Sequence, residues 1–147
     1  MTPQVVVVDT NVLAAGLITK DVHRPVARTV NDMLSGKIVY LLSPALLDEY
    51  RAVLLRPKLC KLHGLTEREI DVLLAELVAS AIWREPEPVG PAPDPGDSHL
   101  WALLGRHPGS ILITGDRLLI EQPPETASVI SPRTYIERFS GSLPAAE

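Results

Sequence analysis

The sequence predicts an α/β fold built around a central parallel sheet. Short apolar runs rich in β-branched residues alternate with segments of helical periodicity, and turn or capping residues separate the two kinds of segment. The chain has 147 residues, of which 46% are hydrophobic and 22% are charged, and this suits one domain with a substantial core. We therefore expect a single domain over residues 1–147, with its core over about 4–139 and a tail over 140–147.

The chain opens with a predicted strand and two predicted helices. Residues 5–8 are four consecutive valines, a run typical of a strand covered on both faces. Thr10 and Asn11 follow with side chains that can cap a helix, and apolar residues then recur at helical spacing. A second helix is expected over 25–35, because Gly36 is a typical residue at a helix end.

A second strand and a third helix should come next. Residues 38–42 form a short apolar run, which predicts the strand. Ser43 followed by Pro44 is a typical helix start, with a capping side chain and a proline in the first turn. We expect this helix to continue until Pro57, because proline lacks the amide hydrogen that a helix interior requires.

A long loop should divide the rest of the chain. Before it, Thr66 and Glu69 have the spacing of a capping box and predict a helix, and residues 81–83 are expected to form a short strand. The five prolines within 85–96 exclude a regular helix or a central strand there. Since the part of the chain beyond this loop is too short to bury its own core, we expect a surface loop within one domain.

The last part of the chain continues the alternation of helix and strand. A helix is expected over 97–105, a buried strand over 111–113, a short strand over 129–130 and a closing helix over 132–139. Strands that alternate with helices in this way imply a parallel sheet.

Four acidic side chains are expected to meet at one edge of this sheet. Asp9 and Asp116 each follow a run of strand-forming residues, so both should project from the carboxyl ends of parallel strands. Glu49 and Asp97 each share a helical face with apolar residues, which turns them inward. Clustered carboxylates repel one another unless a divalent cation neutralises them, and oxygen ligands select Mg²⁺ or Mn²⁺. The chemistry expected of such a site is metal-assisted hydrolysis of a phosphodiester bond.

Each of these acids also has an ordinary structural explanation. Asp9 can be a helix N-cap and nothing more, and Glu49 can be a surface acid of its helix. Asp97 can cap the helix that it begins, with Asp94 as a turn residue before it, and Asp116 can be a turn acid. These explanations leave the convergence of all four acids to coincidence. The four histidines have no spacing suitable for zinc, and none is assigned to the site.

Six short segments extend this pattern over residues 4–139. They are Val-Val-Asp-Thr-Asn-Val-Leu (7–13), Leu-Ser-Pro-Ala-Leu-Leu-Asp-Glu-Tyr (42–50), Arg-Pro-Lys-Leu (56–59), Asp-Pro-Gly-Asp-Ser-His-Leu (94–100), Leu-Ile-Thr-Gly-Asp (112–116) and Ile-Ser-Pro-Arg-Thr-Tyr-Ile (130–136). In these segments the sequence resembles the PIN-domain ribonucleases, and within them the VapC-like toxin components of bacterial toxin–antitoxin systems. The resemblance implies a three-layer α/β/α fold with a parallel sheet of four to five strands.

The resemblance also implies which residues form the site. The implied catalytic residues and ligands of Mg²⁺ or Mn²⁺ are Asp9, Glu49, Asp97 and Asp116, with Asn11, Ser43, Asp94 and Thr114 in supporting positions. Gly96 and Ser98 stand where the family commonly has further acids, which leaves Asp94 or Asp97 as the third ligand, and the helical-face argument favours Asp97. Arg117 stands where another acid often follows Asp116, which weakens a second metal position.

By the same resemblance the substrate is RNA, and the protein is a metal-dependent endoribonuclease that acts as the toxin of a toxin–antitoxin pair. The implied partners are a cognate antitoxin and a second copy of the chain. Basic residues expected near the edge can hold flanking RNA phosphates, although each is also consistent with an ordinary surface charge. They are Lys20, Arg24, Arg51 and Arg117.

Two other functions remain as alternatives. One is a PIN-like domain that binds without cleaving. The other is a phosphatase-type phosphoryl-transfer enzyme in which Asp9 is phosphorylated. A haloacid-dehalogenase-type phosphatase needs a second aspartate two residues after the first, and Asn11 stands there.

Composition limits the kinds of binding site and the cellular location that we expect. A formal net charge of -4 gives no overall attraction for nucleic acid, so a bound metal would have to supply the local positive charge. The single cysteine, Cys60, excludes an intrachain disulfide and a cysteine-cluster zinc site. No apolar run approaches the roughly 20 residues of a membrane span, and the N-terminus lacks a basic secretory start. We expect a cytoplasmic protein without a membrane partner.

Overall fold

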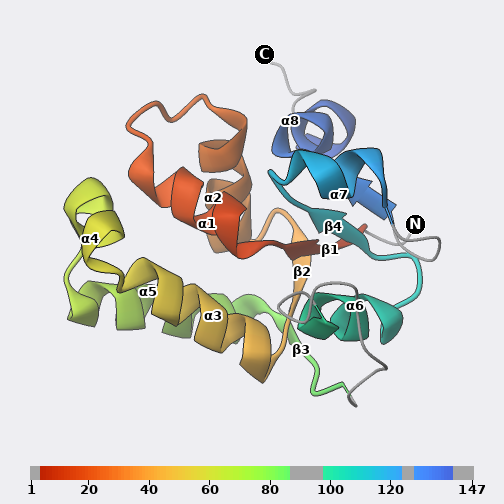
Figure 1. Cartoon of the computed structure of the whole chain (residues 1–147), viewed down its shortest axis with the longest axis horizontal. Coiled ribbons are helices and arrows are strands. Elements are labelled where there is room, and N and C mark those ends of the chain that lie inside the picture. Colours follow the sequence, from red (N-terminus) through yellow and green to blue (C-terminus); the bar gives the residue numbers. More distant parts are fainter. Residues whose placement is uncertain (1–3, 87–97, 124–127, 141–147) are drawn as a thin grey trace.

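Five parallel strands form the centre of the protein. The computed structural model describes residues 4–86, 98–123 and 128–140, and within them the strand order is β3-β2-β1-β4-β5 (Figure 1). The strands are β1 (Val5–Val8), β2 (Val39–Leu42), β3 (Ile82–Trp83), β4 (Ile111–Ile113) and β5 (Ser128–Ile130). Each neighbouring pair is parallel, which confirms the predicted fold class.

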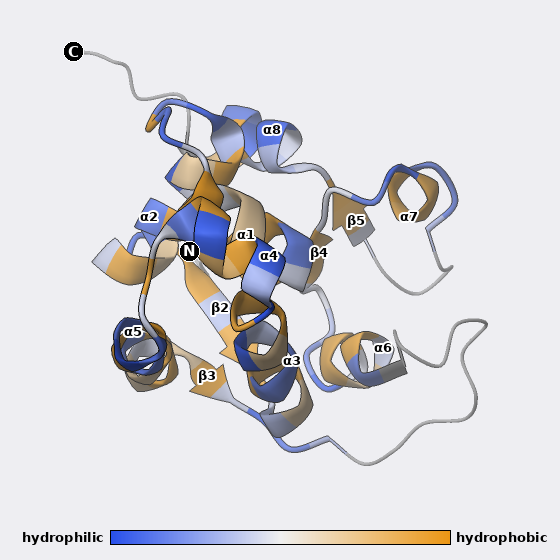
Figure 2. Cartoon of the chain, turned by 60° about the vertical axis from the view of Figure 1, so that its left-hand side comes forward, coloured by the Kyte–Doolittle hydropathy of each residue, from blue (hydrophilic) through white to orange (hydrophobic). Residues whose placement is uncertain are grey.

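Eight α-helices flank the sheet in the described part of the chain. They are α1 (Thr10–Ile18), α2 (Pro25–Ser35), α3 (Pro44–Leu54), α4 (Pro57–His63), α5 (Glu67–Ser80), α6 (Ser98–Gly105), α7 (Arg117–Glu121) and α8 (Pro132–Tyr135), and a π-helical turn, η2 (Ile136–Ser140), follows the last. The chain steps outward from β1 to β2 and β3, and later in the opposite direction from β4 to β5. Because parallel crossovers are right-handed, the two directions place their helices on opposite faces. Figure 2 shows α6 and α7 on one side of the sheet and α2 and α5 on the other, which makes three layers.

The centre of the sheet positions the candidate site. All four valines of β1 are buried, because the strand has neighbours on both edges and helices on both faces. Val8 lies beside Ile113 in the register of β1 and β4, so the residues that follow these two strands are neighbours. The connections after β1 and β4 leave in opposite directions, and such a point opens a crevice at the carboxyl ends of the strands.

Several helix ends confirm the capping signals of the sequence. Helix α2 covers the predicted residues and ends at Gly36, whose φ of 79° is the left-handed conformation that glycine adopts without a steric penalty. The capping box of Thr66 and Glu69 is formed at the start of α5. Ser43 caps α3, and Pro44 lies in the first turn of that helix.

Other helix boundaries differ from the expectation. The N-cap of α1 is Asp9, and neither Thr10 nor Asn11 has that role. Helix α3 ends at Leu54, and Pro57 begins α4 instead of ending α3, because the missing amide hydrogen of proline has no cost in a first turn. Helix α7 has no counterpart among the predicted helices, and the closing helix changes to a π-helical turn at Ile136.

Some expectations concern parts of the chain outside the description. The loop expected over 85–96 is described only at its first two residues, and the tail expected over 140–147 only at its first. Asp94, Asp97 and Gly96 also lie outside the described residues. None of the described helices has the length and apolar character needed to cross a membrane.

Candidate active site

Asp9 lies where β1 passes into α1, and its two carboxylate oxygens have different partners. Oδ1 accepts a hydrogen bond from the backbone amide of Thr10 at 2.8 Å, as part of the cap of α1. Oδ2 accepts from Thr114 Oγ1 at 2.8 Å and from Asn11 Nδ2 at 3.4 Å. The residue is only 8% exposed. Helix capping therefore accounts for one oxygen, and the other is directed to a separate polar cluster.

Asn11 and Thr114 join the ends of β1 and β4 around this carboxylate. Asn11 Oδ1 accepts from the amide of Gly115 at 3.0 Å, while its Nδ2 also donates to Thr114 Oγ1 at 3.4 Å. The amide of Asp116 donates to the same Thr114 hydroxyl at 3.1 Å. The structure thus brings Asn11 and Thr114 against Asp9, in the positions suggested for supporting residues.

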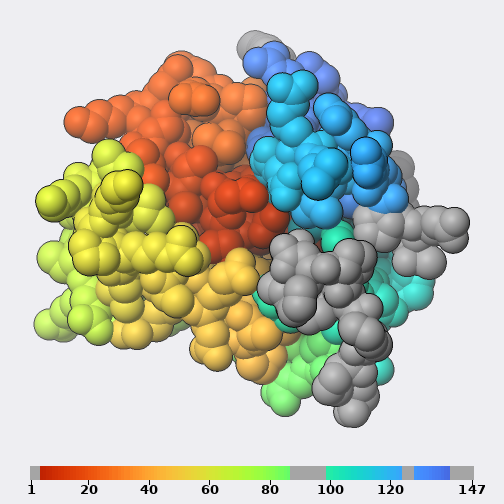
Figure 3. All heavy atoms as spheres, in the orientation of Figure 1, coloured from red at the N-terminus to blue at the C-terminus, as the bar shows by residue number. Residues whose placement is uncertain are grey.

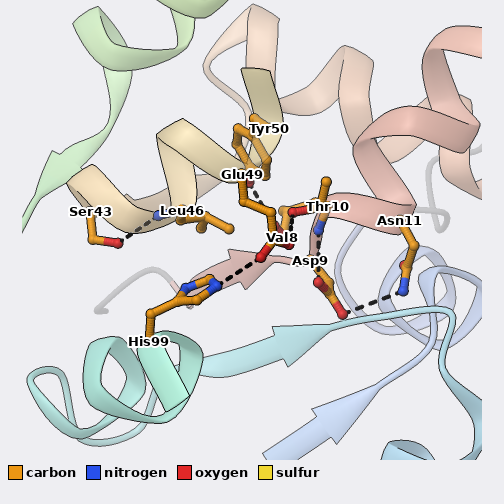
Figure 4. Close-up of polar contacts among 9 residues, drawn as sticks. All are labelled: Val8, Asp9, Thr10, Asn11, Ser43, Leu46, Glu49, Tyr50 and His99. Atoms are coloured by element: carbon orange, nitrogen blue, oxygen red, sulfur yellow. Dashed lines mark hydrogen bonds and ion pairs between the residues drawn. The ribbon is translucent and has the colours of Figure 1, made fainter. Parts of the chain in front are cut away.

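Glu49 reaches the same edge from α3. Its Oε2 accepts from Thr10 Oγ1 at 2.5 Å, and its Oε1 lies 2.9 Å from His99 Nε2 (Figure 4). Thr10 consequently holds two acids at once, Asp9 through its amide and Glu49 through its hydroxyl. In the space-filling view, the surface at the start of α1 (red) lies between those of α3 (amber) and α7 (light blue) (Figure 3).

Tyr50 fixes α3 to the end of β1. Its hydroxyl donates to the carbonyl oxygen of Val8 at 2.6 Å, one residue before Asp9. The side chain is fully buried, and burial holds the pKa of Tyr50 well above its ordinary value, so the phenol stays neutral and remains a donor. Because Glu49 precedes Tyr50, this bond sets the distance between the two acids.

Ser43 acts on the site only through its helix. Its Oγ accepts from the amide of Leu46 at 3.2 Å, which is the N-cap bond of α3, and Figure 4 shows the side chain directed along that helix. In the described structure Ser43 makes no hydrogen bond to Asp9 or Glu49. Its support for the acids is therefore the stability of the helix that carries Glu49.

Asp116 lies at the same edge and caps α7. Its Oδ1 accepts from the amides of Leu118 at 3.0 Å and Leu119 at 3.4 Å. The residue is exposed, and its negative charge is one of the influences that raise the pKa of Asp9. Asp116 therefore caps a helix and also places a negative charge near Asp9.

Burial dominates the electrostatics of Asp9 among the described residues, and neighbouring negative charges act in the same direction. Burial raises the pKa of Asp9 above its ordinary value, and the hydrogen bonds from Thr114 and Thr10 only partly oppose this effect. The negative charges of Glu49 and Asp116 raise the pKa further. A hard divalent cation fits such a set of oxygen donors, because it would replace the mutual repulsion by attraction.

The described residues do not complete a metal site by themselves. Among them, no group of three histidine, cysteine, aspartate or glutamate side chains is placed to hold a metal ion. Asp94 and Asp97, the two candidates for the third ligand, are not among these residues.

The four basic residues suggested for RNA contacts have different surroundings. Arg51 is bound by two carboxylates of α5, Glu67 at 2.8 Å and Asp71 at 2.8 Å. Arg117 is highly exposed and lies 3.8 Å from Glu121. Lys20 and Arg24 are exposed in the connection between α1 and α2. A phosphate contact by Arg51 would have to compete with its two carboxylate partners.

His99 is the site residue that the sequence did not reveal. It lies at the start of α6 and contacts Glu49 from a position 50 residues further along the chain. The available signal was its position two residues after Asp97, within the segment 94–100. A histidine that pairs with a glutamate cannot be recognised from its spacing to other histidines.

Comparison with known proteins assigns this chain to a family. The family model described as PIN domain matches residues 5–118. No curated protein matches the chain. The matched range runs from β1 to the start of α7 and so contains Asp9, Glu49 and Asp116.

Proposed function

Because this chain belongs to the PIN-domain family, whose members are generally nucleases, we propose that it is a metal-dependent endoribonuclease. The observation that carries the proposal is the double contact of Thr10 with Asp9 and Glu49. Two acids that are far apart in the sequence share one residue at the carboxyl edge of the sheet. Like charges held together cost free energy, so the capping of α1 by Asp9 does not explain why Glu49 lies beside it.

We further propose that the site holds Mg²⁺ or Mn²⁺, because PIN-domain nucleases typically use divalent metal ions and the donors here are oxygens. The proposed ligands are Asp9, Glu49, Asp116 and Asp97, with Asp94 as the alternative to Asp97. When bound, the cation supplies positive charge for the attacked phosphate and activates water for hydrolysis.

The chain itself contributes a rigid frame for these ligands. Hydrogen bonds from Thr10, Thr114 and Asn11 hold both oxygens of Asp9, so the carboxylate does not have to be ordered when substrate binds. Cys60 belongs to α4, where its thiol donates to the Leu54 carbonyl at 3.4 Å, and in the described structure it makes no hydrogen bond to any of the proposed ligands. The proposed reaction is hydrolysis by water, without a covalent intermediate on the protein.

The biological setting is part of the proposal. On the resemblance of segments 42–50 and 56–59, we propose a toxin of a toxin–antitoxin pair that acts in the cytoplasm, forms a homodimer and is inhibited by a cognate antitoxin. Lys20, Arg24 and Arg117 are proposed to hold RNA phosphates, and Arg51 only if it leaves Glu67 and Asp71. Co-expression with the product of the neighbouring reading frame tests the pairing: a stable complex without nuclease activity is expected.

The test of activity uses the purified chain with a labelled single-stranded RNA. We expect cleavage with Mn²⁺ or Mg²⁺, and none after addition of EDTA. Asp9→Asn and Asp97→Asn should each abolish cleavage, because each removes a ligand charge. Asp48→Asn is the matched control, since Asp48 is an exposed acid beside Glu49 on the same helix, and it should cleave like the wild type. Full activity of Asp9→Asn would contradict the assigned site.

The same assay separates the alternative functions. A PIN-like domain that only binds would retain RNA in the presence of EDTA and leave it intact in Mn²⁺. A phosphatase would release phosphate from a phosphomonoester, and Asn11 argues against it, because its amide is engaged with Asp9, Thr114 and Gly115 as a structural link.

A further inference from the structure

His99 joins α6 to the acid carried by α3. Its Nε2 lies 2.9 Å from Glu49 Oε1, and Figure 4 shows the imidazole directed from α6 toward that carboxylate. The contact is partly shielded from water, since 20% of the His99 side chain and 35% of the Glu49 side chain are exposed. A hydrogen bond in such a position orients a carboxylate more firmly than one in open solvent.

The direction of this hydrogen bond is defined by chemistry. An ionised carboxylate only accepts, so Nε2 carries the hydrogen and donates it to Glu49. The other ring nitrogen, Nδ1, is inaccessible to solvent and has no hydrogen-bond partner in the described part of the chain. Among the described residues, Glu49 is therefore the hydrogen-bond partner that orients the imidazole.

Glu49 receives one donor on each oxygen. His99 donates to Oε1, and the hydroxyl of Thr10 donates to Oε2 at 2.5 Å. Together the two donors fix the plane of the carboxylate, and each oxygen keeps a lone pair for another partner. Thr10 also donates to Asp9 through its amide, so the contacts run without interruption from His99 to Asp9.

We propose that His99 is a positioning residue that orients the Glu49 carboxylate for binding of the divalent cation. The inference rests on the proposed function, because it concerns the same metal site. Partners that hydrogen-bond to ligating carboxylates are part of a metal site, and their loss typically weakens metal affinity about 10- to 100-fold. His99 acts through Glu49 and needs no direct contact with RNA.

The test compares two side chains of similar size, of which only one has a hydrogen-bond donor. His99→Gln keeps an amide N–H near the position of Nε2, whereas His99→Leu fills the space without a donor. Mn²⁺ affinity is measured on the full chain by calorimetry. We expect His99→Leu to bind Mn²⁺ about 10- to 100-fold more weakly and His99→Gln to restore most of the affinity. His107→Ala, which removes a half-buried histidine just after α6, should bind like the wild type.

Two further measurements keep the outcomes distinct. Unfolding by urea shows whether each variant folds, and His99→Ala replaces the leucine variant if the latter does not. Wild-type affinity in His99→Leu would overturn the inference, as would a glutamine variant that binds as weakly as the leucine variant. RNA cleavage by the wild type, measured in parallel, then shows whether the proposed function stands. A wild type that neither binds Mn²⁺ nor cleaves RNA would overturn both.

Discussion

Asp9 shows how one carboxylate takes part in folding and in a site. Its Oδ1 caps α1 through the amide of Thr10, while its Oδ2 is held by Thr114 and Asn11. The cap fixes the position of the side chain, because the start of α1 follows directly from the central strand. The position has an electrostatic cost, because the carboxylate is buried near the negative charges of Glu49 and Asp116.

Because of this cost, the contribution of Asp9 to the free energy of unfolding depends on pH. Its pKa is raised above 3.8, so the folded state holds the proton more tightly than the unfolded state. The contribution of Asp9 to the free energy of unfolding therefore falls as pH rises from below 3.8 through the folded pKa, and then stays constant. In EDTA, the unfolding free energy of Asp9→Asn minus that of the wild type should increase over this range. Urea unfolding at a series of pH values measures the difference, and a value that decreases with pH would show that the pKa of Asp9 is lowered.

A substitution of Tyr50 can distinguish an effect on protein stability from an effect on the geometry of the site. Tyr50→Phe leaves the buried carbonyl of Val8 without this donor, and we expect a loss of about 1–3 kcal/mol in unfolding free energy. Tyr40→Phe is a matched control, because the buried Tyr40 donates to the Leu77 carbonyl at 2.8 Å. Both variants should lose similar stability, but only Tyr50→Phe should also weaken Mn²⁺ binding. Equal metal affinities in the two variants would contradict a role of Tyr50 in spacing the acids.

At the level of elements, α3 is the helix on which the site depends most. Ser43 caps its start, Glu49 lies on the face directed to the strand ends, and Tyr50 bonds its middle to β1. Arg51 bonds the same helix to α5 through Glu67 and Asp71. The helix is thus held along its length, which reduces the freedom of Glu49 to move away from Asp9.

Loss of the α3 cap should therefore affect more than stability. Ser43→Ala is expected to cost about 1 kcal/mol of unfolding free energy, as is typical of a lost N-cap. Ser131→Ala is the comparison, since Ser131 caps α8 through the amide of Thr134 at 3.1 Å. RNA cleavage at a temperature where both variants are folded should decrease for Ser43→Ala and remain unchanged for Ser131→Ala. The opposite ranking would show that the orientation of α3 does not limit activity.

At the level of the whole molecule, the order of strands creates the site. Five strands in the order β3-β2-β1-β4-β5 place the ends of β1 and β4 side by side, although more than 100 residues separate them in the sequence. Helices from both faces then add Glu49 from α3 and His99 from α6. Because the net charge is -4, the proposed RNA binding would depend on local basic residues and on the proposed cation.

The surroundings of the basic residues predict which of the proposed RNA contacts form. Lys20→Gln should lower the salt dependence of RNA binding by about 0.7 in the slope of log affinity against log salt, the value for one phosphate contact on a single strand. Arg51→Gln should leave the slope unchanged, because Glu67 and Asp71 already neutralise this guanidinium. Fluorescence titrations in Mn²⁺ with a non-hydrolysable RNA analogue at several salt concentrations measure both slopes. A larger change for Arg51→Gln would show that its ion pairs open when RNA binds.

The sequence by itself determined the elements that local chemistry specifies. The buried valines of β1, the glycine at the end of α2 and the capping box of α5 are patterns within a few residues, and the structure confirms each of them. The alternation of strands and helices was sufficient to predict the parallel sheet, because short connections through helices require it. The expected meeting of Asp9 and Glu49 rests on the end of a parallel strand for Asp9 and on an apolar helical face for Glu49.

Only the tertiary structure decided the contacts between distant side chains. The bond of His99 to Glu49 and the ion pairs of Arg51 with α5 depend on how helices pack, and no local pattern records that packing. Pro57 begins α4 instead of ending α3, because proline can stop one helix or start the next at no cost in a first helical turn. Asp9 was consistent with a cap or with a ligand, and the structure placed its two oxygens in different surroundings because β4 supplies Thr114 beside the end of β1.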